Sequence, residues 1–182
     1  MSLTRTPFWF LRHGETDWNA QNLSQGNVDI PLNATGIYQA EVAAQRLRNR
    51  GIATIIASPL SRARDTAQTV ADVLGLPVSL DEGLREVSFG VKEGHPMADW
   101  FATWVDGSFT PEAAESFSDL RARAKLAINR ALDQTAPVLV VAHGALFRAL
   151  RAEMGLEPNV RTPNATPFWC EPGTPWSLSE AS

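Results

Sequence analysis

The sequence predicts an α/β fold, a three-layer sandwich with a mostly parallel central sheet and helices on both faces. Four short segments have the length and the β-branched or aromatic composition of buried strands: 7–11, 53–58, 77–80 and 137–143. Segments with apolar residues at helical spacing alternate with them. Because neighbouring parallel strands need a crossover connection, this alternation favours a parallel sheet covered by helices.

The first two helices are predicted from their apolar faces and their end residues. A helix over 36–50 follows the candidate cap Asn33 and has four apolar residues on one face: Ile37, Ala40, Ala44 and Leu47. A helix over 61–75 follows the second strand and ends at Gly75, since glycine readily takes the left-handed conformation that closes helices. Both helices therefore have a face suited to packing on the sheet.

The remaining elements follow the third and fourth strands. Apolar spacing predicts a long helix over 115–132 and a shorter one over 144–155. Before the long helix, residues 95–115 are rich in aromatic side chains and are expected to form a small helical subdomain or a lid. The tail over 164–178 is interrupted by Pro and Gly, which predicts an edge strand and a loop.

Length and composition favour a single globular domain over residues 1–182. Hydrophobic residues make up 44% and charged residues 20%, which is typical of a globular protein and not of a disordered chain. No apolar run approaches the ~20 residues that span a bilayer, and the run at 7–11 is too short for a secretory signal. We therefore expect a cytoplasmic protein with no membrane partner.

The cysteine and histidine content argues against metal chemistry. Cys170 is the only cysteine, which excludes an internal disulfide and a cysteine-based metal cage. No histidine pair at helical spacing and no carboxylate cluster offers another metal site. We therefore expect neither a metal nor another cofactor.

Residues with useful chemistry come directly after three of the predicted strands. They are Arg12, His13, Ser58, Arg62, His143 and Gly144. Because ligands of such sheets bind beyond the carboxyl ends of the strands, we expect these residues to meet at one edge of the sheet. Helices that start at Gly14 and Gly144 would add backbone N–H donors for an anion there.

Two imidazoles, two guanidiniums and a carboxylate suit the chemistry of a phosphate ester. Arg12 and Arg62 would hold the phosphoryl group, because a guanidinium offers phosphate oxygens a fork of donors. Neutral His13 could attack phosphorus, and a protonated His143 would stabilise the charge that develops during transfer. Glu86, which follows the third strand, is the candidate general acid for the leaving group and the later base for water.

Four motifs that occur in order along the chain carry a resemblance to a known family. They are "LRHGETDWN" at 11–19, "SPLSRARDTA" at 58–67, "LREVSFGVKEG" at 84–94 and "VVAHGALFRAL" at 140–150. In this order they resemble the histidine phosphatase superfamily, specifically its phosphoglycerate mutase-like branch. The resemblance covers nearly the whole chain and implies a phosphoglycerate mutase-like fold and a phosphohistidine intermediate.

The resemblance also implies a role for each matching residue. His13 matches the phosphorylated nucleophile, and Glu86 matches the proton donor. The rest of the phosphate pocket is matched by Arg12, Arg62 and His143. Three further residues match positions that touch the phosphate or the substrate: Asn19, Gln25 and Gly26. With Arg12, Arg62 and Gly144 they form the expected substrate-binding set.

Some of these residues also have an ordinary structural interpretation. Arg62 could cap or salt-bridge its own helix, and Glu86 could form an ion pair with Arg85 or Arg62. His95 has no partner at a suggestive spacing and is expected in a surface loop. Three more arginines are expected on solvated helix faces: Arg64, Arg121 and Arg123.

The sequence favours a metal-independent phosphomonoesterase that acts on a small organic phosphate through a covalent phosphohistidine. A cofactor-dependent phosphoglycerate mutase is the alternative, although a mutase needs extra cations and Lys92 is the only one between Glu86 and Arg121. An alternative of another class is a non-catalytic protein that binds phosphorylated ligands or partner proteins.

The expected partner is a small phosphorylated substrate. The formal net charge is −4, whereas a nucleic-acid binder would carry a basic face, so no nucleic-acid partner is expected. A homodimer is an alternative that the sequence leaves undecided, because three residues of the tail would form an exposed contact patch: Trp169, Pro172 and Trp176.

Overall fold

The computed structural model describes residues 1–182 and confirms the predicted fold class. The strands are β1 (Phe8–Arg12), β2 (Thr54–Ala57), β3 (Val78–Leu80), β4 (Val138–Ala142), β5 (Pro167–Glu171) and β6 (Ser177–Glu180). They form one sheet in the order β3-β2-β4-β1-β5-β6. The strands β1 to β4 pair in parallel, and β5 and β6 add antiparallel pairs on one side.

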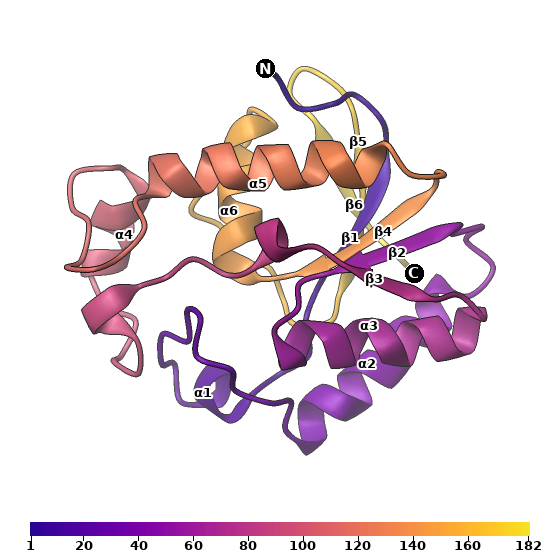
Figure 1. The fold of residues 1–182 in the computed structure, drawn as a ribbon, viewed down its shortest axis with the longest axis horizontal. Coiled ribbons are helices and arrows are strands. Elements are labelled where there is room, and N and C mark those ends of the chain that lie inside the picture. The colour runs from indigo at the N-terminus through magenta and orange to yellow at the C-terminus, as the bar shows by residue number, and fades with distance from the viewer.

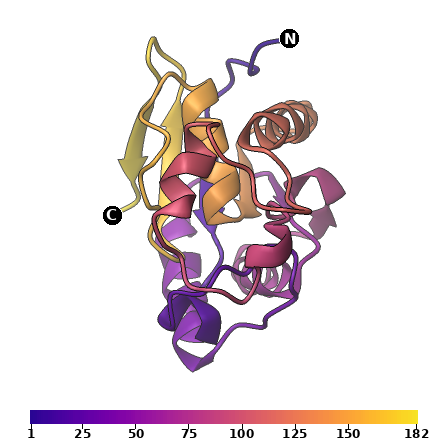
Figure 2. The same ribbon diagram turned by 90° about the vertical axis from the view of Figure 1, so that its left-hand side faces the viewer.

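Two long helices cover each face of the sheet (Figure 1). The helices are α1 (Asp17–Ala20), α2 (Ala34–Leu47), α3 (Ser61–Leu74), α4 (Trp100–Val105), α5 (Phe117–Leu132) and α6 (Gly144–Glu153). The helices α2 and α3 lie on one face, and α5 and α6 lie on the other. The short helices α1 and α4 lie at the end of the molecule that faces the viewer in Figure 2. None of the helices combines the length and apolar composition that a membrane crossing needs.

Alternating residues of the central strands divide the core into two layers. Phe8 and Phe10 of β1 pack with α5 and α6, whereas Trp9 and Leu11 pack with α2 and α3. The ring of Phe10 stacks on the ring of Phe147 in α6, with 4.1 Å between the ring centroids. All five residues of β4 are buried, because this strand lies between β2 and β1 with helices on both faces.

The helix α2 buries most of the face that the sequence predicts, with one exception. Its cap is Asn33, whose side chain accepts a hydrogen bond from the N–H of Gly36. Ile37 is 50% exposed, so its placement on the buried face was wrong. The other three predicted residues are buried as expected, and Ala43 lies with them on the buried face: Ala40, Ala43, Ala44 and Leu47. Small alanine side chains there let α2 pack closely.

The tail forms an antiparallel hairpin instead of a single edge strand. The strand β5 pairs with β1 on one side and with β6 on the other, so β6 is the edge. Trp176 is 4% exposed and packs edge-on against Phe8, and Trp169 lies against Trp9 with 5.2 Å between ring centroids. The exposed patch expected among Trp169, Pro172 and Trp176 is therefore not formed, because both indoles pack inward.

An aromatic cluster anchors α4 to the core. Trp104 is fully buried, and its ring contacts three others at centroid distances of 5.0 to 5.4 Å: Phe89, Phe101 and Phe117. The indole N–H of Trp104 donates to the carbonyl of Glu115 at 2.9 Å. The middle of the segment 95–115 is thus packed on the core, while Phe109 near its end is exposed.

Candidate active site

Three strands end at one edge of the sheet and bring the two predicted histidines together. The strand β4 lies between β1 and β2, and His13 and His143 directly follow β1 and β4. The backbone N–H of His13 continues the strand pairing and donates to the carbonyl of Ala142 at 3.0 Å. The two imidazole rings lie 5.3 Å apart between centroids, and both residues are buried. Parallel pairing of neighbouring strands is therefore what places these rings side by side.

A backbone contact fixes the tautomer of His13. Its Nδ1 atom lies 2.6 Å from the carbonyl oxygen of Gly14. Since a carbonyl oxygen only accepts hydrogen bonds, Nδ1 must carry the ring proton. In the neutral ring, Nε2 then has a free lone pair at the cavity that His13 lines. The local structure thus leaves Nε2 as the ring nitrogen with an unprotonated lone pair at the cavity.

Gly14 has a packing role and not the anion-binding role that the sequence suggests. A Cβ atom at Gly14 would lie 2.3 Å from the carbonyl oxygen of Gly36, so the chain passes too close to α2 for a side chain. The N–H of Gly14 donates to Thr66 Oγ1 at 3.1 Å. No helix begins there, because α1 starts at Asp17 with Thr16 as its cap. The prediction of a helix N-terminus at Gly14 is therefore wrong.

Ser58, the residue that directly follows β2, holds the second histidine. Nε2 of His143 lies 2.7 Å from Ser58 Oγ, and both residues are fully buried. The other ring nitrogen, Nδ1, is buried and has no partner within the protein. When the hydroxyl donates to Nε2, Nδ1 carries the ring proton and can donate it to an anion.

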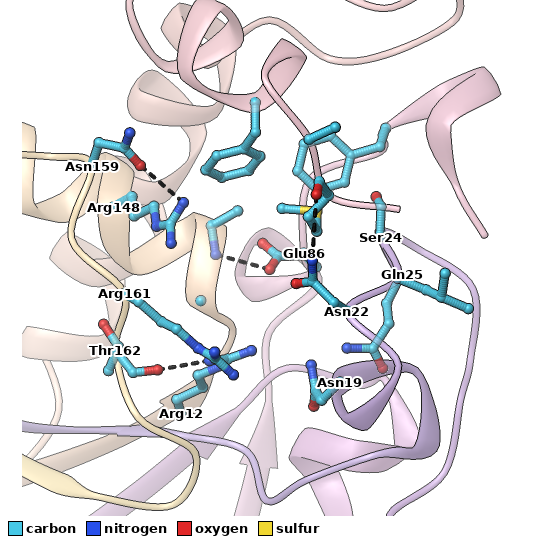
Figure 3. Close-up of a pocket in the computed structure, with 18 of the residues that line it drawn as sticks. Arg12, Asn19, Asn22, Ser24, Gln25, Glu86, Arg148, Asn159, Arg161 and Thr162 are labelled. Carbon is cyan, nitrogen blue, oxygen red and sulfur yellow. Dashed lines mark hydrogen bonds between the residues drawn. The ribbon is translucent and has the colours of Figure 1, made fainter. Parts of the chain in front are cut away.

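One buried and one partly buried arginine, Arg62 and Arg12, present unpaired donors at the same edge. Arg62 is 0% exposed, and its terminal nitrogens donate to the carbonyls of Val28 and Gly26, each at 2.7 Å. Arg12 donates to the carbonyl of Thr162 at 2.7 Å (Figure 3). The Nε atoms of both guanidiniums are buried without a partner in the protein. Burial lowers the pKa of each arginine to about 10, so both remain charged near neutral pH.

Glu86 occupies the N-terminus of α6. Its carboxylate accepts hydrogen bonds from the backbone N–H groups of Val87, Ala145 and Leu146, each at 3.0 Å. A helix N-terminus stabilises negative charge, which explains why this carboxylate is held there. The donors that α6 was expected to offer an anion are therefore partly used by Glu86. An ion pair with Arg85 is not formed, because Arg85 pairs with Glu82.

Two side-chain amides and a glycine line the opposite wall. The oxygen of Asn19 accepts from the N–H of Thr16 and from the amide of Asn164, which leaves its NH2 group as a donor. The oxygen of Gln25 accepts from the hydroxyl of Thr16 at 2.6 Å. Both amide nitrogens face the cavity (Figure 3). The carbonyl of Gly26 accepts a hydrogen bond from the guanidinium of Arg62. Gly26 has a φ of 53°, a conformation that favours glycine.

The cavity has a volume of about 470 Å³ and includes two arginines that the sequence reasoning missed. Arg148 lies on α6 one turn after Gly144, so helical spacing from the fourth motif was a signal for it. Arg161 comes from the irregular connection between α6 and β5, where no pattern pointed to it. The guanidinium of Arg12 lies against Gly144, where a Cβ atom would be 3.1 Å from Arg12 Nε.

One arginine expected on a solvated surface instead supports the segment before Glu86. Arg123 is half-buried and forms a two-point ion pair with Glu115 at 2.8 and 2.9 Å. Its Nη1 also donates to the carbonyls of Gly83 and Arg85, each at 2.8 Å. The expectation for Arg123 is therefore corrected, because this side chain ties α5 to the residues that carry Glu86.

Burial and the neighbouring arginines keep both histidines neutral. Burial, with the charges of Arg62 and Arg12, holds the pKa of His13 well below its usual value of 6.5. Burial and Arg62 lower the pKa of His143 well below 6.5 in the same way. The protonated His143 that the sequence reasoning considered is therefore not the form of the free protein. A bound phosphate dianion would oppose these shifts, because its charge has the opposite sign.

We expect the free energy of unfolding to fall as the pH is lowered from about 7.5 to about 5.5. Below pH 6.5 the unfolded chain takes up protons at His13 and His143, whereas the folded protein does not, so acid favours unfolding. Each histidine contributes at most ~1.4 kcal/mol per pH unit in this window. Urea denaturation in phosphate-free buffer measures the slope. The change in the free energy of unfolding per pH unit should be smaller in His13→Gln. An unchanged slope in that variant contradicts the lowered pKa of His13.

The fold and the site together define a class of protein. An α/β sandwich with two neutral imidazoles, buried guanidiniums and a carboxylate at the carboxyl edge of its sheet is the architecture of a phosphoryl-transfer enzyme. No three His, Cys, Asp or Glu side chains are grouped as metal ligands. The chain belongs to the histidine phosphatase superfamily (branch 1), because the sequence model of this family matches residues 8–164. The resemblance drawn from the four motifs is confirmed.

Relatives with similar sequences have a name that points to mutases. A protein of Yersinia enterocolitica named "Probable phosphoglycerate mutase GpmB" is 39% identical over 164 residues, which cover 83% of this chain and 76% of the relative. A protein of the same name from Yersinia pestis is 40% identical over 161 residues, covering 81% of this chain and 74% of the relative.

Similar solved structures are named as phosphatases. A mycobacterial glucosyl-3-phosphoglycerate phosphatase in complex with VO3 has a TM-score of 0.83 and 28% identity, and the match covers 97% of both chains. A phosphoserine phosphatase of Entamoeba histolytica in complex with 3-phosphoglyceric acid has a TM-score of 0.81 and 27% identity, and covers 97% of this chain and 96% of that one.

Proposed function

We propose that this protein is a metal-independent phosphomonoesterase that hydrolyses a small organic phosphate through a covalent phosphohistidine on His13. One observation carries the proposal: the contact of Nδ1 with the Gly14 carbonyl leaves a neutral Nε2 as nucleophile beside two guanidiniums whose buried Nε atoms have no partner in the protein. The phosphatase names of the similar structures support hydrolysis over isomerisation.

In the first step, Nε2 of His13 attacks phosphorus and forms a P–N bond while the P–O bond of the ester breaks. The leaving alkoxide takes a proton from Glu86, which must be protonated at this stage. Nδ1 of the histidine keeps its proton and its bond to the Gly14 carbonyl. The products of this step are the free alcohol, phosphohistidine and the Glu86 carboxylate.

In the second step, water attacks phosphorus on the opposite side to the P–N bond. The Glu86 carboxylate takes a proton from the water, and the P–N bond breaks to release inorganic phosphate and restore neutral His13. Arg12, Arg62 and Nδ1 of His143 donate to the equatorial oxygens in both steps, where negative charge is greatest. Their buried setting strengthens each of these interactions.

We expect the purified protein to hydrolyse p-nitrophenyl phosphate and to keep this activity in EDTA. All the groups in the proposed mechanism are protein side chains, so removing divalent metals should change the rate less than about twofold. Release of nitrophenol is measured with and without EDTA and again after EDTA with added Mg²⁺. Activity that disappears in EDTA and returns with Mg²⁺ contradicts the proposal.

The mutase is the second candidate, favoured by the relatives named as probable phosphoglycerate mutases. Phosphorus NMR of a reaction with 3-phosphoglycerate separates the two activities. Free phosphate as the main product supports the phosphatase, and accumulation of 2-phosphoglycerate supports the mutase. A protein that binds phosphate esters but converts none of a broad panel is instead the non-catalytic binder.

A further inference from the structure

In the proposed mechanism the phosphate group occupies only the end of the cavity at His13, and the cavity wall carries further cations. His13 and Arg12 mark the phosphate end. Arg148, Arg161 and Asn159 line the same cavity from α6 and from the connection that follows it (Figure 3). We propose that this second group binds a carboxylate of the substrate, so that the enzyme acts on phosphate esters of small carboxylic acids. This inference rests on the proposed phosphatase function, because it assumes that the ester phosphate lies at His13.

Arg148 is held in a fixed orientation. Its Nη1 donates to Asn159 Oδ1 at 3.1 Å, and its Cζ lies 4.4 Å from the centroid of the Phe101 ring. The contact with the amide oxygen also orients Asn159, whose NH2 group remains a donor. Arg148 has no salt bridge, and its Nε and Nη2 atoms have no hydrogen-bond partner in the protein. A positioned guanidinium with free donors is suited to two-point binding of a carboxylate.

Arg161 adds a second free cation beside the first. Its side chain makes no hydrogen bond or salt bridge within the protein, and the residue is exposed at the cavity. The charge of Arg161 lowers the pKa of both Arg12 and Arg148, after the larger effect of burial on each. The three guanidiniums are therefore close enough to repel one another. An anion between them relieves this repulsion, and such a cluster is unexpected in a protein of net charge −4 unless an anion binds there.

The free donors of Arg148 match the shape of a carboxylate. Its Nε and Nη2 atoms lie on one edge of the planar guanidinium, so they can donate in parallel to the two oxygens of one carboxylate. Besides Glu86, the carboxylate on the lining is Asp99, which is exposed to solvent and forms no ion pair with Arg148 or Arg161.

Two matched pairs of substrates test the inference. The members of each pair differ at the carboxylate: 3-phosphoglycerate against glycerol 3-phosphate, and O-phosphoserine against O-phosphoethanolamine. We expect the wild-type kcat/KM to be at least about tenfold higher for the carboxylate member of each pair, since a lost charged hydrogen bond costs about that factor. Fructose 1,6-bisphosphate is the second-phosphate probe and should be hydrolysed less efficiently than 3-phosphoglycerate.

Variants then connect the preference to the two arginines. Arg148→Gln and Arg161→Gln should each lower kcat/KM for 3-phosphoglycerate about tenfold to a hundredfold, mainly through KM. The same variants should change kcat/KM for glycerol 3-phosphate less than about threefold. Arg64→Gln, an exposed arginine on α3 outside the cavity, is the matched control and should change neither.

The failures of the two proposals can be told apart. A wild-type protein that hydrolyses p-nitrophenyl phosphate but shows no preference within either pair overturns the carboxylate site and leaves the phosphatase standing. Equal losses for both members of a pair in Arg148→Gln also overturn it, because the arginine would then serve the phosphate or the fold. Preference for the bisphosphate overturns it as well. Absence of hydrolysis of every ester removes the phosphatase proposal itself.

Discussion

Replacement of His13 by alanine is expected to lower kcat by about a thousandfold or more, because the variant has no atom that can form the covalent bond to phosphorus. Alanine keeps the strand β1 and its pairing with β4 intact, since that pairing uses backbone atoms. Arg12, Arg62 and His143 remain in place, so the variant should still bind inorganic phosphate or vanadate. Steady-state hydrolysis of p-nitrophenyl phosphate measures the loss, and calorimetry with phosphate measures the retained binding.

Direct detection of the intermediate completes this test. Quenching the wild-type protein in strong base during turnover would trap phosphate on nitrogen, because a P–N bond is stable in base and is lost on acidification. Mass spectrometry of an alkaline digest should place this phosphate on the peptide that contains His13. His95→Ala is the matched control, since His95 lies in an exposed loop, and it should retain full activity and labelling. A His13→Ala protein with more than about a tenth of wild-type activity, or a label elsewhere, would remove His13 from the mechanism.

The strands and the sheet edge could be predicted because their signals are local. Runs such as Val138–Ala142 are apolar throughout, since a central parallel strand is buried on both faces. Once these strands are recognised, their carboxyl ends place His13 and His143 together without any knowledge of the loops. The face of α2 was less predictable, because an apolar residue such as Ile37 satisfies the periodicity and still faces solvent.

The rest of the site depends on contacts between distant parts of the chain. Glu86 is bound by the N–H groups of Ala145 and Leu146, which lie 59 and 60 residues further on. No local pattern predicts which helix N-terminus a carboxylate will reach. Arg161 enters the cavity from an irregular segment, where neither a period of two nor one of 3.6 residues applies. Local pattern thus predicted the phosphate end of the cavity better than the end proposed to select the substrate.

Replacement of Glu86 by glutamine is expected to slow hydrolysis of alkyl phosphates by about 10²–10⁴-fold, because the amide cannot give a proton to the departing alkoxide. An aryl phosphate behaves differently. Nitrophenolate leaves without a proton, so the first step with p-nitrophenyl phosphate should be slowed much less. The second step still needs a base to activate water, so phosphohistidine should accumulate. Rapid mixing should show a burst of nitrophenol close to one equivalent of enzyme, followed by slow turnover.

The burst separates proton transfer from a structural role of Glu86. Glutamine has one acceptor oxygen for three backbone N–H groups that two carboxylate oxygens now serve, so some stability is lost, on the order of 1–3 kcal/mol. A variant that is damaged only structurally would lose alkyl and aryl hydrolysis to the same extent and show no burst. Glu82→Gln is the matched control, because Glu82 is exposed and pairs with Arg85 outside the cavity. A burst confined to Glu86→Gln supports the proton-transfer role, since only the loss of the base, with the nucleophile intact, leaves phosphorus on His13.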